Sequence, residues 1–197
     1  MIEKSEVISF FDRLAPEWDA NMVTDDTVIN TILDNANVKS GKDVLDVACG
    51  TGVLFPYYLK RNIGSLTAVD ISTKMIGIAK EKYKDTDIDI ICADAETYDF
   101  KKKYDSIVVY NAFPHFKDAE SLISILSGKL KPQGTLTIAH GMSREKINSH
   151  HKGTGSKVSN GLMAAEELKA IFEKYLTVST VISDDSMYQV AGVYNEA

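Results

Sequence analysis

A short stretch around residue 50 constrains the fold more than any other part of this 197-residue chain. Residues 43–48 are mostly apolar and lead into a loop of small residues that ends at Gly52. A second apolar stretch, residues 53–59, follows at once. This order predicts a buried strand, a tight turn and a helix. Because Gly50 and Gly52 leave bare backbone beside the first N–H groups of a helix, we expect a nucleotide-like cofactor here.

Three aspartates follow three apolar runs, and they are 24 residues apart each time. Asp46 lies near the end of the first predicted strand, Asp70 ends the second, and Asp94 follows the third. Successive strand ends of a parallel sheet line one edge, where ligands bind. An acid at the position of Asp70 suits a ribose, since one carboxylate accepts both hydroxyl hydrogens, and Asp94 is then placed to meet an adenine edge. Taken singly, each aspartate is also an ordinary strand-end or helix-capping residue.

The loop fits neither of two common nucleotide motifs. The dinucleotide fingerprint needs a third glycine where Phe55 stands, and no Gly-Lys-Ser/Thr of a P-loop follows. The segment from Asp46 to Gly52 instead resembles the D-x-G-x-G-x-G signature of class I S-adenosylmethionine-dependent methyltransferases, with Ala48 at the first glycine. The resemblance covers roughly residues 7–140 and continues in order through residues 69–72, 93–96, 104–108 and 130–136.

This resemblance implies S-adenosyl-L-methionine as the cofactor and suggests its contacts. Asp70 would bind the ribose hydroxyls, Asp94 with the Ala95 backbone would bind adenine, and Asp46 would steady the loop or the cofactor's amino group. Asn111, after the fourth strand, would lie near the methionine amine or the methyl acceptor. The cofactor-binding residues that we expect are Asp46, Ala48, Gly50, Gly52, Asp70, Ile71, Asp94, Ala95 and Asn111.

Alternating strand and helix patterns predict a single α/β domain over residues 1–197. We expect a doubly wound, Rossmann-like sheet of seven mostly parallel strands with an antiparallel last strand. Its strands fall near residues 43–48, 65–70, 88–92, 104–110 and 134–140, followed by a helix at 164–174 and a closing antiparallel pair.

Two segments lie outside this core pattern. Residues 1–40 are expected to form an N-terminal helical lid, because residues 10–19 resemble the helix that covers the site of small-molecule methyltransferases. A plain amphipathic helix packed on the sheet is compatible with the same pattern. Residues 141–163 are expected to form an active-site loop, since long polar loops within compact domains are usually functional or disordered.

All four histidines lie beyond residue 110, namely His115, His140, His150 and His151. His115 follows the fourth strand and His140 ends the fifth, where the methyl-acceptor pocket of this architecture lies. Three interpretations are open. The four form a divalent transition-metal site; one of them, His115 or His140, is a catalytic base for an oxygen or nitrogen acceptor; or they are unconnected.

Composition limits the class of partner. A net charge of −6 disfavours a surface that binds nucleic acid. The sequence has no run of 18 apolar residues, so we expect no membrane span. With two cysteines and no basic-then-apolar start, we expect a cytoplasmic protein. The favoured function is methylation of a small-molecule acceptor, with the oligomeric state open. The alternative is a non-catalytic cofactor- or metal-binding module on the same fold, because fold alone does not separate the two.

Overall fold

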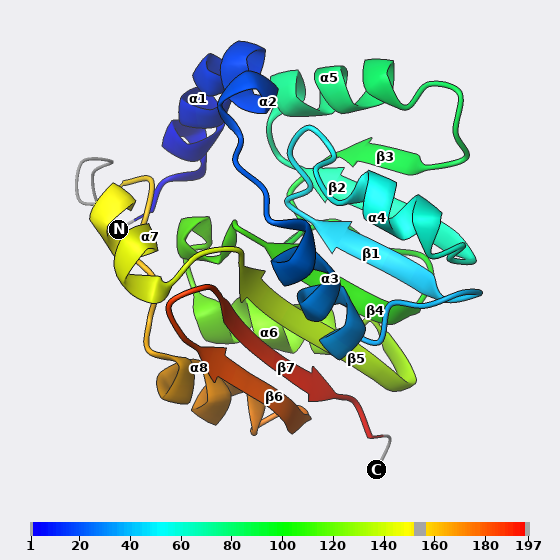
Figure 1. Cartoon of the computed structure of the whole chain (residues 1–197), viewed down its shortest axis with the longest axis vertical. Helices are drawn as coiled ribbons and strands as arrows, with labels where there is room; N and C mark the ends of the chain where they lie inside the picture. The colour runs from blue at the N-terminus through cyan, green and yellow to red at the C-terminus, as the bar shows by residue number, and fades with distance from the viewer. Residues whose placement is uncertain (1, 152–156, 196–197) are drawn as a thin grey trace.

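A seven-stranded sheet forms the centre of the computed structural model, which describes residues 2–151 and 157–195 (Figure 1). Its strand order is β3-β2-β1-β4-β5-β7-β6. The five neighbouring strands β3, β2, β1, β4 and β5 run parallel, whereas β7 is antiparallel to both β5 and β6. The predicted doubly wound sheet with its antiparallel closing pair is therefore confirmed. The strands are Asp43–Val47 (β1), Ser65–Asp70 (β2), Asp89–Cys92 (β3), Tyr104–Tyr110 (β4), Leu130–His140 (β5), Thr177–Ser183 (β6) and Tyr188–Val193 (β7).

Helices cover both faces of the sheet. One face carries α3 (Asp26–Asn35), α4 (Phe55–Lys60) and α5 (Thr73–Lys82). The other carries α6 (Ala119–Ser127) and α8 (Ala165–Phe172). Because side chains alternate along a strand, β1 sends Val44 to the first face and Leu45 to the second, and both are fully buried. The further helical elements are α1 (Lys4–Leu14), η1 (Ala15–Glu17), α2 (Trp18–Asn21), η2 (Phe113–His115) and α7 (Arg144–His151).

Local sequence signals set several helix ends. Ser72 precedes α5, and its hydroxyl accepts a hydrogen bond from the Met75 amide at 3.2 Å. Pro56 falls in the first turn of α4, where a missing N–H costs nothing. Pro16 follows the end of α1 at Leu14 and lies in the 3₁₀ turn η1. The chain therefore bends between α1 and α2 instead of continuing as one helix.

Residues 141–163 hold a helix as well as a loop. Helix α7 buries Ile147, and a two-way contact fastens it to the returning chain: the Asn148 side chain donates to the Leu162 carbonyl and accepts from the Leu162 amide. A helix with so little apolar surface leaves almost no periodic signal in the sequence. Part of the expected lid also differs, since α3 packs on the sheet through Ile29 and its neighbours.

The strand order fixes where a ligand can bind. The strand order reverses at β1, because β2 pairs with one side of β1 and β4 pairs with the other. The crevice beyond the carboxyl ends of such a strand pair is the usual ligand site of open α/β sheets. Figure 1 shows α1, α2 and α7 on the side toward which the arrowheads of β1, β2 and β3 point. Within the part of the chain described, no helix combines the length and apolar character that crossing a bilayer requires.

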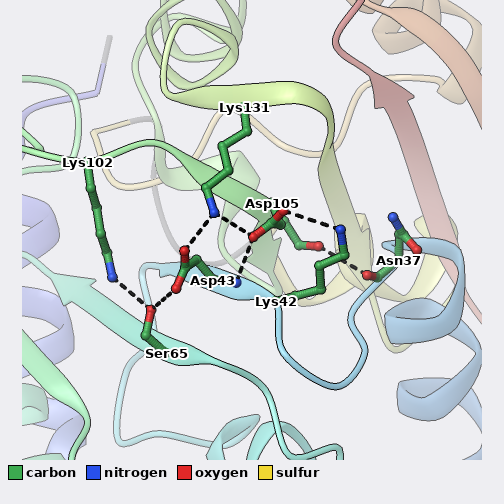
Figure 2. A network of polar contacts seen from close by, with 8 residues as sticks. Asn37, Lys42, Asp43, Ser65, Lys102, Asp105 and Lys131 are labelled. Atoms are coloured by element: carbon green, nitrogen blue, oxygen red, sulfur yellow. Dashed lines mark hydrogen bonds and ion pairs between the residues drawn. The ribbon is translucent and has the colours of Figure 1, made fainter.

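A polar network joins the opposite, amino-terminal ends of the strands. Figure 2 shows the Lys131 ammonium between the carboxylates of Asp43 and Asp105, at 2.6 and 2.8 Å. Asp105 also accepts a hydrogen bond from the Asp43 amide and pairs with Lys42, and Asp43 accepts one from the Ser65 hydroxyl. The network therefore links the starts of β1, β2, β4 and β5 and supports their register.

Lys131→Met tests this network. Hydrogen bonds from Lys131 and Ser65 lower the pKa of Asp43, and the same lysine with the Asp43 amide lowers the pKa of Asp105 although burial opposes it. Depressed carboxyl pKa values give stability that is present above about pH 4 and is lost as the pH falls. We expect the variant to lose about 1 kcal/mol of unfolding free energy at pH 7 and to show a weaker loss of stability on acidification. Urea unfolding at pH 3 and pH 7 measures both.

Lys39→Met provides the matched control, because Lys39 is exposed and takes no part in this network. Equal effects of the two substitutions at both pH values would contradict a stabilising role for the network.

Candidate active site

A cavity lies at the switch point, where β1, β2, β3 and β4 end. The space between its walls measures about 970 Å³, and part of that space is open to solvent. Loops after the four strands form one wall, and α1, α2 and Met22 form the other. Among the cofactor residues expected from the sequence, the lining includes Ala48, Gly50, Asp70, Ile71, Asp94, Ala95 and Asn111.

Asp70 joins the ends of β1 and β2. One carboxylate oxygen accepts a hydrogen bond from the Gly50 amide at 2.9 Å, and the other accepts one from the Ser72 amide at 2.8 Å. Burial raises the pKa of Asp70, and these backbone donors partly oppose that rise. The carboxylate thus fixes the glycine loop while it lines the cavity, and although the Ile71 amide also acts on it, the carboxylate keeps acceptor capacity for a ligand hydroxyl.

The glycine loop presents bare backbone to the cavity at Gly50. A Cβ placed there would meet only the Trp18 indole nitrogen, at 3.9 Å. Ala48 also lines the cavity and adopts a φ of +57°, in the left-handed region that favours glycine. This conformation explains why the D-x-G-x-G-x-G signature has glycine at that position. Ala48 carries about 1 kcal/mol of backbone strain there.

Asp46 and Gly52 do not line the cavity. Asp46 shares the orientation of Val44 and is 2% exposed within the β1–α4 interface. Its Oδ2 has no hydrogen-bond partner in the described part of the structure. Burial, and then the charge of Asp70, raise the pKa of Asp46 well above its usual value. At Gly52 (φ +87°), a Cβ would come within 2.7 Å of the Phe55 ring, so this glycine serves packing. Direct cofactor contacts of Asp46 and Gly52 stay predictions.

Two acids of the N-terminal helices contact the loops that follow β1 and β2. Asp12 accepts hydrogen bonds from the Ser72 hydroxyl and the Lys74 amide at the start of α5. Asp19 accepts one from the Thr51 hydroxyl in the glycine loop and pairs with Lys82 at 2.7 Å. These contacts hold α1 and α2 over the cavity.

Lys4 makes the third such contact, with the loop after β3. Its ammonium pairs with Asp94 and, at 2.9 Å, with Glu96. The other Asp94 oxygen accepts a hydrogen bond from the Glu96 amide at 3.0 Å. The acid expected at an adenine edge is therefore shared with a residue of α1. Sequence reasoning did not find Lys4 because the partners are 90 residues apart and no local pattern connects them.

His115 lies in the cavity wall beyond β4. Its Nδ1 is 2.8 Å from the Val158 carbonyl oxygen, and its ring meets the Phe11 ring edge-on at 4.9 Å between centroids. A carbonyl only accepts hydrogen bonds, so we assign the proton of the neutral ring to Nδ1 and the basic lone pair to Nε2. Of the two histidines proposed as a base, His115 is the one that the cavity exposes.

His140 lies behind the cavity wall. It is 2% exposed, faces Tyr188 across the β5–β7 pair, and does not line the cavity. The side chains of His150 and His151 lie outside the described part of the structure. Among the described residues, no group of three or more His, Cys, Asp or Glu side chains is arranged to hold a metal ion. The four-histidine metal site therefore stays a prediction, because two of its four side chains lie outside the described part of the structure.

Tyr110 completes the wall at the end of β4. It is 6% exposed, and burial raises its pKa to about 12; the charge of Asp25 adds to this rise, whereas a hydrogen bond with Asn111 opposes it. Its hydroxyl fills the space beside Gly141, where a Cβ would be only 2.3 Å from that oxygen. Tyr110 therefore remains a protonated, neutral group at physiological pH.

Comparison with known proteins identifies the family. Residues 44–134 match a family model described as a methyltransferase domain. The chain is 30% identical over 190 residues to a malonyl-[acyl-carrier protein] O-methyltransferase of Priestia megaterium, with 89% of this chain and 69% of that protein covered. The chain belongs to the class I S-adenosylmethionine-dependent methyltransferases. It is also 32% identical over 142 residues to an Acetivibrio thermocellus methyltransferase of the same name, covering 71% of this chain but only half of that relative.

Solved structures of low sequence identity share the fold. The N-methyltransferase NodS of Bradyrhizobium japonicum, in complex with S-adenosyl-L-homocysteine, superimposes with a TM-score of 0.75 at 16% identity, over 97% of this chain and all of that chain. A DhpI complex with the same ligand gives a TM-score of 0.73 at 16% identity, with 98% of each chain covered. Both structures share the sheet topology described above.

Asp46→Asn tests the environment of the buried acid. When the folded state raises the pKa of an acid, the protein loses stability as the pH rises above the acid's unfolded pKa of about 3.9. The reason is that the acid then ionises readily only in the unfolded state. We expect the asparagine variant to be more stable than the wild type at pH 8, by about 1–3 kcal/mol, and nearly equal to it at pH 4. Thermal and urea unfolding at the two pH values measure the difference. A variant that is equally or less stable at pH 8 would show that Asp46 is satisfied in the native state.

Proposed function

We propose that this protein catalyses methyl transfer from S-adenosyl-L-methionine to a small molecule. The observation that carries the proposal is the union of three features in one cavity: bare backbone at Gly50, the buried carboxylate of Asp70, and Asp94 at the next strand end. The two structures of the same fold that hold S-adenosyl-L-homocysteine are consistent with this cofactor.

The residues present fit an adenosyl cofactor. Asp70 offers acceptor lone pairs to ribose hydroxyls, and the Asp94–Ala95 segment offers polar groups and a buried methyl to an adenine ring. The open face of Gly50 leaves room for the ligand chain. When bound, the cofactor supplies an electrophilic methyl group on a sulfonium sulfur. The contribution of the protein is to orient the acceptor and exclude water, and α1 and α2 enclose the cavity for that purpose.

We propose His115 as the base that takes the acceptor's proton. It lines the cavity, and its Nδ1 contact with Val158 orients the ring with Nε2 as the basic nitrogen. Tyr110 is a poor alternative because its pKa of about 12 keeps it protonated. His140 is buried behind the wall. The four-histidine metal site remains a prediction, and elemental analysis of untagged protein for bound metal tests it.

The names of the relatives do not fix the acceptor. The chain spans half of the Acetivibrio relative, so that relative's activity toward malonyl-[acyl-carrier protein] is only one candidate for this protein. A small molecule remains the proposed acceptor class. A non-catalytic binding module on the same fold would bind cofactor without turnover, and an assay for S-adenosylhomocysteine release with an acceptor present separates the two.

Asp70→Asn tests the cofactor site. Replacing the carboxylate removes charge-assisted hydrogen bonding, which is worth about 1.5–3 kcal/mol, so S-adenosylhomocysteine affinity should fall at least about tenfold. Isothermal titration measures the affinity, and Asp85→Asn at an exposed position is the matched control. Wild-type binding no tighter than that of adenosine, or unchanged affinity in Asp70→Asn, would refute the cofactor assignment.

His115→Ala tests the base. We expect kcat to fall by about 10²–10⁴-fold, the acidic limb of the pH–rate profile to disappear, and added imidazole to restore part of the rate, because only proton transfer is lost. S-adenosylhomocysteine affinity should change little. His140→Asn is the comparison, since His140 was the other candidate. A larger rate loss in His140→Asn, with imidazole rescue there instead, would reverse the assignment.

A further inference from the structure

The charged side chains in the cavity wall lie at one end. They are Lys4, Asp70, Asp94 and Glu96, from α1 and from the loops after β2 and β3. On the side of β4, the described lining includes Tyr110, Asn111, His115 and Phe116, and the Phe11 ring lies against the rings of His115 and Trp18. We call these residues, together with Trp18 and Met22, the acceptor chamber. Apart from the imidazole of His115, the described residues of this chamber carry no ionisable cation and no carboxylate.

The cations closest along the chain serve elsewhere. Lys117 follows Phe116 but is exposed and does not line the cavity. Arg144, at the start of α7, donates from Nε to the Leu162 carbonyl at 2.9 Å and is also absent from the lining. An anion placed in the acceptor chamber would therefore lose its hydration without gaining a lysine or arginine partner among the described residues.

The surroundings of Tyr110 add a negative potential. Burial is the largest cause of its raised pKa, and the negative charge of Asp25 raises it further. Asp25 caps α3 and acts electrostatically on Tyr110, and Asp26 accepts the hydroxyl hydrogen of Tyr57. Carboxylates outside the chamber therefore act on its wall, and they disfavour a second negative charge inside it.

We infer that the acceptor chamber selects an uncharged, largely apolar acceptor and rejects carboxylates. The aromatic and thioether surfaces of Trp18, Phe116 and Met22 supply contact area for an apolar molecule. The neutral hydroxyl of Tyr110 and the ring of His115 supply the polar contacts that orient one reacting group. This inference rests on the proposed function, because it assumes that the cofactor binds at the charged end of the cavity and the acceptor binds in the chamber.

Trp18 is the only tryptophan in the chain and lines the cavity, so its fluorescence reports occupancy directly. The test titrates benzamide and benzoate, which match in shape and differ in charge, into the protein saturated with S-adenosylhomocysteine at pH 8. The sulfur of this ligand is uncharged, and an ordinary imidazole is neutral at that pH, so a preference reports the chamber itself. We expect benzamide to bind at least tenfold more tightly than benzoate.

A charge placed in the chamber should reverse the preference. Met22→Lys supplies the missing cation and should tighten benzoate binding at least tenfold relative to the wild type. Val23→Lys is the matched control, because Val23 is the next residue, is 94% exposed and does not line the cavity. It should leave both affinities unchanged. The wild-type comparison stands even if Met22→Lys does not fold.

Two failures are distinguishable. If S-adenosylhomocysteine itself does not bind, the proposed function fails and the inference fails with it. If S-adenosylhomocysteine binds but benzoate binds as well as benzamide, or neither changes Trp18 fluorescence, only the inference about the acceptor is overturned.

Discussion

The position of one buried carboxylate determines most of the site. Asp70 ends β2, and its two oxygens accept the amides of Gly50 and Ser72, so a single side chain sets the glycine loop after β1 and the start of α5. Removing a carboxylate from water costs free energy, and the raised pKa of Asp70 records that cost. Backbone donors offset part of it while leaving lone pairs toward the cavity. The same residue therefore shapes the loop and presents the acid expected to hold a ribose.

Side chains of the N-terminal helices α1 and α2 contact the loops that follow β1, β2 and β3. Asp19 contacts the loop after β1, Asp12 the loop after β2, and Lys4 the loop after β3. Each contact is partly exposed and is worth about 1 kcal/mol at most, so the three together hold α1 and α2 closed without making the closure irreversible. Lys4 also occupies an oxygen of Asp94, and an adenine amino group at Asp94 would compete with it. Closure and cofactor binding are therefore expected to influence each other.

The sequence predicted the sheet correctly and identified several strand-end residues that line the cavity, because those features are local. A strand, its small-residue loop and the acid at its end lie within a few residues, as at residues 43–52 and 65–72. The contacts of Lys4, Asp12 and Asp19 had no such signal, since their partners are 32 to 90 residues away. Helix α7 was missed because it buries little apolar surface. Asp46 was expected to contact the cofactor because it belongs to the signature motif. The alternation of side chains along β1, which is visible in the sequence, instead turns Asp46 toward α4.

Hydrogen–deuterium exchange with and without S-adenosylhomocysteine tests the central claim most directly, because it reports the loops and the N-terminal helices in one experiment. The account predicts slower exchange on ligand binding in residues 48–52, 70–72 and 94–96, together with α1 and α2. It predicts no change at the amino-terminal ends of the strands, where the network of Lys131 lies. Protection confined to other segments, or exchange that the ligand leaves unchanged, would contradict an adenosyl site formed by these strand ends.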